Sequence, residues 1–299
     1  MTHSELLHRV LRILQATALL LALGAAPDAL AQKTAAKTGS APVDVRLTMA
    51  INEGGAANAD AAETLFKYRE LSEVIEKQLG VTLLIVAVRD RNKLKNALQK
   101  HDYALLLARP NDVPAEAVRD FGYQPVVMEK IPSRTLFIVP KNSPLKTLAD
   151  VKGKTIVTPD AYSNMWRVAN AMLRDTKITM TDEKVKSMRD QAAIGWSMEN
   201  GFFDVGVINS VSGVGRTWEK SGGRVIAASP ELPNLPMIAS PALSESQVAK
   251  VRSALVALDS TDEGRAILKK IGASGFQPAS RQALLDFLAW IGDLPQVKQ

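Results

Sequence analysis

The sequence predicts an α/β fold with two lobes, each a mostly parallel sheet flanked by helices, joined by two crossing segments. Three observations support this prediction. Short, continuously apolar strands alternate with segments of helical periodicity, which is typical of parallel sheets covered on both faces. The chain has 299 residues and is 46% hydrophobic, so it can bury a sizeable core in each lobe. The strand–helix pattern also restarts after an extended segment at residues 134–140.

The first residues of the chain predict export. Two arginines and an apolar run at 13–26 precede the small-residue site Ala-Leu-Ala, which ends at Ala31. We therefore expect a signal peptide over residues 1–31, cleaved after Ala31, and a periplasmic protein. The apolar run is shorter than the roughly 20 residues that span a bilayer, which disfavours an uncleaved membrane anchor. Residues 32–43 are rich in small and polar residues and predict a flexible leader.

Composition excludes several classes of chemistry. There is no cysteine, and His101 is the one histidine of three that lies beyond the signal peptide, so we expect no metal site, no cofactor and no histidine-based triad. The nucleophile pattern G-x-S-x-G is absent, and we expect no enzyme. The net charge of +6 is scattered among acidic residues, which argues against nucleic acid as a partner and indicates a mild bias toward anions. We expect a monomer.

The first lobe is predicted over residues 44–135 and 238–299. Its strands are expected at 45–50, 81–88, 103–108 and 124–129, and its helices at 62–79, 91–99 and 113–120. Ligands of such sheets bind beyond the carboxyl ends of the strands. This rule selects Glu53, in the loop after the first strand, and Arg109, directly after the third.

The second lobe is predicted over residues 136–237. We expect strands at 136–139, 154–157, 203–208 and 224–227, a β-rich segment at 178–180, a short helical segment at 145–151, and helices at 165–173, 190–200 and 213–220. Residues 235–239 are the expected return crossing. Three last helices, at 245–258, 264–271 and 281–291, are expected to cap the first lobe. Asn209 and Ser210 end a strand and are equally consistent with ligand contact and with a turn.

A helix start follows the strand at 154–157. Ser163 or Asn164 can cap this helix, and its free backbone N–H groups suit an anion, with Tyr162 beside them. Arg109 or Arg134 is the expected cationic contact. Alternatives remain: Ser163 only caps its own helix, Arg134 is a strand-edge charge, and Tyr162 packs inside the lobe.

Four phrases carry a resemblance to a known family. They are YRELSEVIEKQLGV from Tyr68, NSPLKTLADVKGKTIV from Asn142, ASPELPNLPMIAS from Ala228 and DSTDEGRAILKKIGASGFQPAS from Asp259. The chain resembles the periplasmic substrate-binding proteins of phosphate, phosphite and phosphonate ABC transporters. The resemblance implies a type II periplasmic binding protein fold that closes on a small ligand and delivers it to a membrane permease.

The binding motif of that family is altered in this sequence. Where the family usually has a Ser-Thr-Ser-Gly run, this chain has Tyr162-Ser163-Asn164-Met165, and Glu53 stands where the family has an aromatic residue. We therefore expect a solute-binding protein for a small anionic ligand, either a phosphonate, a phosphate-like group or another oxyanion, that works with an ABC permease. The alternative is a periplasmic ligand-sensing or accessory binding protein of the same fold, with a sensor protein as its partner.

Overall fold

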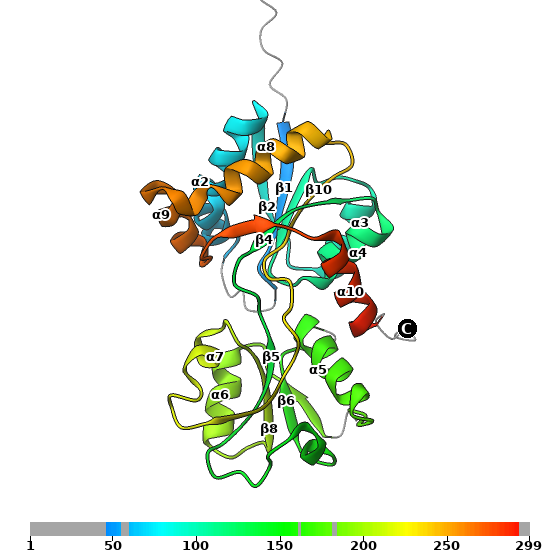
Figure 1. Ribbon diagram of the computed structural model, residues 1–299, viewed down its shortest axis with the longest axis vertical. Coiled ribbons are helices and arrows are strands. Elements are labelled where there is room, and N and C mark those ends of the chain that lie inside the picture. Colours follow the sequence, from blue (N-terminus) through cyan, green and yellow to red (C-terminus); the bar gives the residue numbers. More distant parts are fainter. Residues whose placement is uncertain (1–45, 55–59, 161–162, 181–183, 293–299) are drawn as a thin grey trace, which may run out of the picture. The chain divides into compact units, whose positions relative to one another are not determined.

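The computed structural model describes residues 46–54, 60–160, 163–180 and 184–292 (Figure 1). The predicted signal peptide and leader, at 1–31 and 32–43, lie outside the described residues. None of the described helices combines the length and apolar character needed to cross a membrane. The strands form two separate sheets, as predicted.

The first sheet has six strands in the order β11-β4-β10-β3-β1-β2. They are β1 (Arg46–Asn52), β2 (Thr82–Ala87), β3 (Leu105–Ala108), β4 (Gln124–Glu129), β10 (Met237–Ala239) and β11 (Phe276–Pro278). β1 pairs in parallel with β2 and β3, whereas β10 is antiparallel to both β3 and β4, and β11 is antiparallel to β4. The sheet is mixed because the returning chain enters its middle as β10.

The second sheet has five strands in the order β7-β6-β8-β5-β9. They are β5 (Thr135–Val139), β6 (Ile156–Thr158), β7 (Val185–Ser187), β8 (Val205–Asn209) and β9 (Arg224–Ala228). β6 is parallel to β7 and β8, and the entering strand β5 is antiparallel to β8 and β9. β5 is buried at every position, as its continuous apolar pattern predicts for a central strand.

Helices cover both sheets. The helices of the first part of the chain are α2 (Ala61–Leu79), α3 (Arg91–Gln99) and α4 (Asp112–Asp120). The helices around the second sheet are α5 (Asn164–Asp175), α6 (Gln191–Glu199) and α7 (Gly213–Thr217). The last helices of the chain are α8 (Glu245–Val256), α9 (Asp262–Ile271) and α10 (Arg281–Ile291). Two single 3-10 turns, η2 (Leu148–Val151) and η3 (Leu258–Ser260), complete the described elements. α2 packs against α8 and α9, whereas α4 packs against α3 and α10. α2 ends at Gly80, whose φ of 65° suits a residue without a side chain.

The predicted β-rich segment at 178–180 is wrong. These residues form no strand, and the edge strand β7 follows at Val185–Ser187. Lys177 adopts a left-handed conformation with φ of 60°, and Ile178 N–H bonds back to the carbonyl of Leu173. Ile178 is apolar because its side chain is buried in the core under α5, which sequence periodicity cannot distinguish from strand pairing over three residues.

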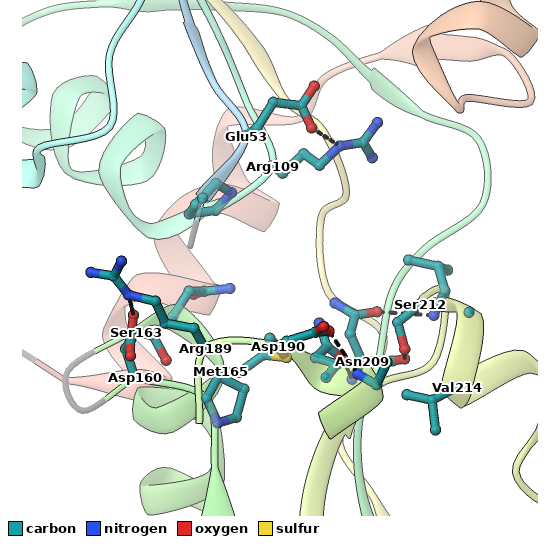
Figure 2. Close-up of a pocket in the computed structure, with 18 of the residues that line it drawn as sticks. Glu53, Arg109, Asp160, Ser163, Met165, Arg189, Asp190, Asn209, Ser212 and Val214 are labelled. Carbon is teal, nitrogen blue, oxygen red and sulfur yellow. Dashed lines mark hydrogen bonds and ion pairs between the residues drawn. The ribbon is translucent and has the colours of Figure 1, made fainter. Parts of the chain in front are cut away.

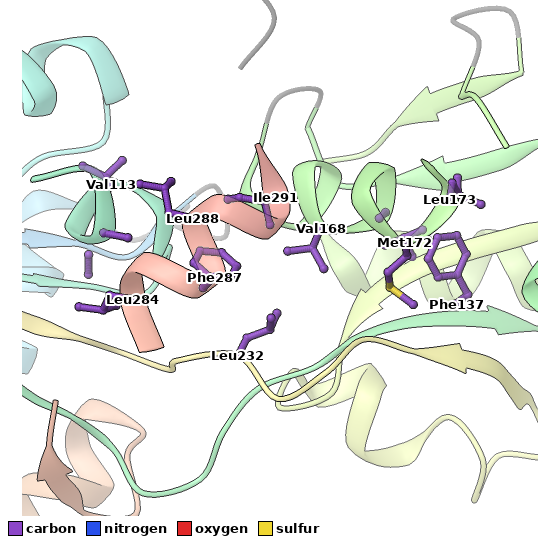
Figure 3. Packing of buried hydrophobic residues seen from close by; sticks show 14 of the residues in the cluster. Val113, Phe137, Val168, Met172, Leu173, Leu232, Leu284, Phe287, Leu288 and Ile291 are labelled. Atoms are coloured by element: carbon purple, nitrogen blue, oxygen red, sulfur yellow. The ribbon is translucent and has the colours of Figure 1, made fainter. Parts of the chain in front are cut away.

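The last three helices all pack against elements of the first lobe, as predicted, and α10 in addition packs against α5. Phe287, Leu288 and Ile291 of α10 share one buried cluster with Val168 and Met172 of α5, which follows β6 of the second sheet (Figure 3). α10 therefore joins α4 to α5. An amphipathic pattern shows that one helix face is buried but does not specify the partner.

Trp290 of α10 packs against the same buried cluster as Phe287. It is only partly buried, and its indole Nε1 donates to the carboxylate of Asp175 at 2.8 Å. The hydrogen bond ties the end of α10 to the end of α5. This contact is a polar tether in addition to the apolar packing of Figure 3.

Two segments of chain run between the sheets, as predicted, but the expected return crossing at 235–239 is placed too late, because residues 237–239 already pair with β3 and β4 as β10. One connects β4 to β5 and the other connects β9 to β10. Ser133 and Leu232 form an antiparallel bridge between them, with hydrogen bonds of 3.2 and 2.8 Å. The exact lobe boundaries, 44–135 with 238–299 and 136–237, stay a prediction.

Candidate functional site

A cavity of about 420 Å³ lies beyond the carboxyl ends of strands from both sheets. Its wall from the first sheet consists of residues that follow β1 and β3, and its wall from the second sheet consists of residues that follow β6, β7 and β8 (Figure 2). The lining residues are Glu53, Gly54, Arg109, Pro110, Pro159, Asp160, Ser163, Asn164, Met165, Arg189, Asp190, Gln191, Ala192, Asn209, Val211, Ser212, Gly213, Val214 and Asn234. This is the position where open α/β sheets bind ligands.

Helix starts dominate the wall from the second sheet. Ser163 caps α5, because its Oγ accepts a hydrogen bond from the N–H of Trp166 at 3.2 Å. Asp190 caps α6 by accepting from Ala192 at 2.8 Å, and Ser212 caps α7 by accepting from Gly215 at 3.0 Å. Each cap satisfies one N–H group, and the first turn of a helix has up to four that lack intrahelical partners. α5 and α6 therefore bring N–H groups and the positive ends of two helix dipoles to the cavity, and α7, with five residues, adds less.

The wall from the first sheet carries an ion pair. Arg109 Nε donates to Glu53 Oε2 at 2.7 Å, and Arg109 Nη2 donates to the carbonyl of Ile271 at 2.5 Å. Glu53 Oε1 accepts from Lys67 at 3.0 Å and from the hydroxyl of Tyr68. The α2 residues Lys67 and Tyr68 thus fix the carboxylate, which in turn orients the guanidinium of Arg109.

This cluster shifts the pKa of its members. Burial raises the pKa of Glu53, but Arg109, the Tyr68 hydroxyl and Lys67 together lower it by more, so it lies below its ordinary value of 4.5. Burial raises the pKa of Tyr68, and the neighbouring Glu53 carboxylate raises it further. Glu53 is therefore ionised and Tyr68 is neutral at neutral pH.

The charged side chains that line the cavity do not have a net positive charge. The carboxylates are Glu53, Asp160 and Asp190, and the guanidinium groups are Arg109 and Arg189. Arg189 lies 3.4 Å from Asp160, and both of these side chains are exposed. Attraction for an anion therefore rests mainly on the backbone N–H groups of the helix starts.

The predicted site residues fall into three groups. Glu53, Arg109, Ser163, Asn164 and Asn209 line the cavity; Arg134 and Ser210 do not; Tyr162 lies outside the described residues. Arg134 donates to the carbonyl of Ser229 at 2.7 Å and to Glu231 at 3.0 Å, and its N–H donates to Ser210 Oγ at 2.9 Å. Asn209 Oδ1 accepts from Val211, and Asn164 Oδ1 is buried without a hydrogen-bond partner among the described residues.

Several lining residues were not predicted from the sequence. Asp190 and Ser212 are capping residues after strands, so the rule that selected Ser163 could also have found them. Gln191 Oε1 accepts from the N–H of Asn209 at 2.7 Å, and Asn234 lies in the proline-rich return crossing. No sequence signal marks Asn234, because crossing segments carry no periodicity.

Two sheets joined by two crossings, with a cavity at the strand ends, define a two-lobed type II periplasmic binding protein. Solved structures with this fold include XAC2383 from Xanthomonas citri bound to chloride ion, which is 15% identical, covers 82% of this chain and 97% of its own, and has a TM-score of 0.68. PhnD1 from Prochlorococcus marinus in complex with methylphosphonate is 16% identical, covers 81% and 95%, and has a TM-score of 0.62. The predicted fold class is confirmed.

The family is established by sequence. The sequence model of the ABC transporter, phosphonate, periplasmic substrate-binding protein family matches residues 54–284. The chain belongs to this family. Its members are periplasmic substrate-binding proteins and not enzymes; they bind small ligands such as phosphonate and work with ABC permeases. A protein of this family from Pseudomonas aeruginosa, PA3383, is 16% identical, covers 81% of this chain and 83% of its own, and has a TM-score of 0.60. No curated protein matches the chain.

Proposed function

We propose that the protein captures a small oxyanion with an organic substituent in this cavity and delivers it to an ABC permease. The observation that carries the proposal is the convergence of the α5 and α6 starts on one cavity that also contains Arg109. Free N–H groups and helix dipoles stabilise a negative group most when water is excluded. Two structural neighbours of this chain support an anionic ligand, because XAC2383 is bound to chloride and PhnD1 is in complex with methylphosphonate.

The size and lining of the cavity favour an organic anion over inorganic phosphate. A cavity of about 420 Å³ falls in the usual range for small-molecule sites. Pro110, Met165 and Val214 contribute apolar surface beside the helix starts. An alkyl or substituted alkyl group on the anion would fill the apolar part of the cavity. A phosphonate has both the anionic group and the organic substituent.

Substitution at the start of α5 tests the position of the anion. Asn164→Asp adds a negative charge beside the proposed anion and should weaken binding of methylphosphonate on the order of tenfold or more, whereas Ser163→Ala should weaken it less because the backbone donors remain. Isothermal titration calorimetry gives the affinities, with melting temperatures for each variant. Asn200→Asp, at the exposed end of α6, is the matched control. Equal affinity of Asn164→Asp and wild type would refute this position for the anion.

Delivery distinguishes transport from sensing. Deletion of the gene should abolish growth on the bound phosphonate as phosphorus source if the protein serves a permease. A sensor of the same fold would instead change the expression of other genes without limiting uptake. Co-transcribed genes for a permease and an ATPase support transport, and a co-transcribed histidine kinase supports sensing.

Export follows from the predicted signal peptide. N-terminal sequencing of periplasmic protein should begin at Gln32, and a retained Met1 would contradict cleavage after Ala31. Size-exclusion chromatography of the mature protein tests the expected monomer.

Ligand binding is also expected to change the relation between the two lobes about the crossings. The packing of α10 on both α4 and α5 adds a third link that such a motion must keep or break. Small-angle scattering with and without the phosphonate measures the change, and an unchanged radius of gyration at saturation would count against it.

A further inference from the structure

Asn234 is a buried polar side chain in the wall of the cavity. It is 6% exposed and lies in the return crossing, between Pro233 and Leu235. Its Nδ2 donates to Glu129 Oε2 at 2.7 Å and to the carbonyl of Ile131 at 3.1 Å. Both side-chain donor hydrogens are therefore used by protein acceptors.

The opposite atom of the same amide is available. Asn234 Oδ1 makes no hydrogen bond within the described part of the chain, and it is not among the polar atoms sealed from solvent without a partner. It is thus the accessible polar atom of a side chain that lines the cavity. Turning the amide over would place Oδ1 against the Glu129 carboxylate, so the Glu129 contact assigns Oδ1 as the atom that stays free to accept a hydrogen bond.

The backbone holds this arrangement in place. Leu235 is 1% exposed and has φ of 44°, a left-handed conformation that is strained for leucine, and Pro236 follows it. Glu129 N–H donates to the carbonyl of Asn234 at 2.9 Å, which pins the strained turn from the other side. Backbone strain that the surroundings maintain is common where a side chain must be aimed at a ligand.

Glu129 itself is anchored at its second oxygen. Oε1 accepts from the N–H and the hydroxyl of Ser274 at 3.1 and 3.3 Å, which leaves Oε2 for Asn234. Ser274 belongs to the segment between α9 and β11. The carboxylate therefore orients the Asn234 amide while making no contact with the cavity itself.

We propose that Asn234 is a specificity-determining residue of the cavity and that its Oδ1 accepts a hydrogen bond from a hydroxyl or amine on the organic part of the ligand. This inference rests on the proposed function, in which the helix starts hold the anionic end. Glu129 acts as a positioning residue through Asn234. The favoured ligand class is then a phosphonate that carries a hydrogen-bond donor rather than a plain alkylphosphonate.

Isosteric pairs of ligands test the proposal. Hydroxymethylphosphonate and ethylphosphonate differ by a hydroxyl in place of a methyl group, and 2-hydroxyethylphosphonate and propylphosphonate differ in the same way one carbon further out. Calorimetric titration of each pair gives a preference ratio, defined as the Kd of the alkylphosphonate divided by the Kd of its hydroxylated partner. The contribution of the phosphonate group is common to both ligands and cancels from this ratio. One neutral hydrogen bond corresponds to a ratio of about two to ten.

Four variants locate the source of that ratio. Asn234→Ala should bring it to near one. Glu129→Gln should lower it as well, because glutamine offers one acceptor where the carboxylate offers two and so releases the Asn234 amide. Ser274→Ala leaves the Oε2 contact intact and should keep the wild-type ratio, and Asn200→Ala, at the exposed end of α6, should keep it too.

The outcomes separate the two proposals. A wild-type ratio above two for either pair that is lost in Asn234→Ala supports the inference. A wild-type ratio of two or less for both pairs, or an unchanged ratio in Asn234→Ala, overturns it while phosphonate binding stands. Failure of wild type to bind any of the four phosphonates overturns the proposed ligand class and the inference with it. Should Asn234→Ala fail to fold, the volume-conserving Glu129→Gln decides by the same comparison.

Discussion

Two clusters of carboxylates and cations differ in how deeply they are buried and in what they contact. The cavity cluster is made of Glu53, Lys67, Tyr68 and Arg109 and lies in the wall of the ligand cavity. The seam cluster is made of Arg91, Asp112, Glu116 and Arg167 and joins α4 to α5. In the seam cluster Arg167 Nη1 lies 2.9 Å from Asp112 and 3.1 Å from Glu116, and Nη2 donates to the carbonyl of Gly292 beyond α10.

The comparison shows that burial of charge does not by itself mark a ligand site. The Arg167 and Asp112 side chains are 2% and 0% exposed, whereas those of Arg109 and Glu53 are 27% and 13% exposed. The seam cluster is the more deeply buried, yet it contacts the residue after α10 through Arg167 and contributes no residue to the cavity. The residues of the cavity cluster that line the cavity, Glu53 and Arg109, directly follow parallel strands, and this position distinguishes them.

The largest expected effect comes from breaking the seam cluster. Arg167→Met leaves Asp112 and Glu116 without one of their buried cations and should reduce the free energy of unfolding by about 3–5 kcal/mol. Urea denaturation measures the loss. Arg174→Met, at an exposed position of the same helix, should cost less than about 1 kcal/mol. A loss below 1 kcal/mol for Arg167→Met would show that the seam cluster contributes little to stability.

The same substitution in the cavity cluster should cost less stability and more binding. Arg109→Met removes a charged partner of Glu53, but Lys67 and Tyr68 remain and the site is partly solvated, so we expect a loss of about 1.5–3 kcal/mol. Affinity for methylphosphonate should fall, because a cation leaves the cavity wall. Unchanged affinity would remove Arg109 from the proposed ligand contacts.

Glu53 and Glu129 should respond to pH in opposite directions. The pKa of Glu53 lies below 4.5, so the ionised form stabilises the fold; this contribution is present above pH 4.5 and is lost as pH falls through the lower folded-state value. Burial raises the pKa of Glu129 above 4.5, so the protonated form is the one that the fold favours. Its contribution to the free energy of unfolding is present below pH 4.5 and is lost as pH rises through the higher folded-state value. The stability advantage of wild type over Glu53→Gln should shrink in acid, and that of wild type over Glu129→Gln should shrink toward neutral pH. Unfolding free energies between pH 3 and 7 test both slopes, and equal slopes would contradict them.

The smallest expected effect separates capping from binding at α5. Ser163→Ala and Ser244→Ala each remove an N-cap hydroxyl, on α5 and α8, and each should cost about 1 kcal/mol of stability. Only Ser163 lines the cavity, so only Ser163→Ala should also weaken phosphonate binding, by a few-fold. Identical binding by both variants would leave Ser163 as a cap and nothing more.

Sequence reasoning predicted most of the elements because their signals are local. Gly80 ends α2, Ser163 starts α5, and the continuous apolar run of β5 indicates a strand covered on both faces. The rule that ligands bind beyond parallel strands selected Glu53 and Arg109, and both line the cavity. Arg134 was selected on charge alone, and its guanidinium is engaged within the crossing by Ser229 and Glu231.

The sequence by itself determined the fold class, the family and the first helix start of the cavity, because capping residues, periodicity and family phrases are all written within a few residues of one another. Only the tertiary structure decided which distant residues meet. It placed α10 between α4 and α5, buried Arg167 against Asp112, and joined Asn234 in the cavity wall to Glu129, which lies 105 residues earlier in the chain. Such pairings depend on how faces and crossings pack in space, and neither helical nor strand periodicity specifies the partner.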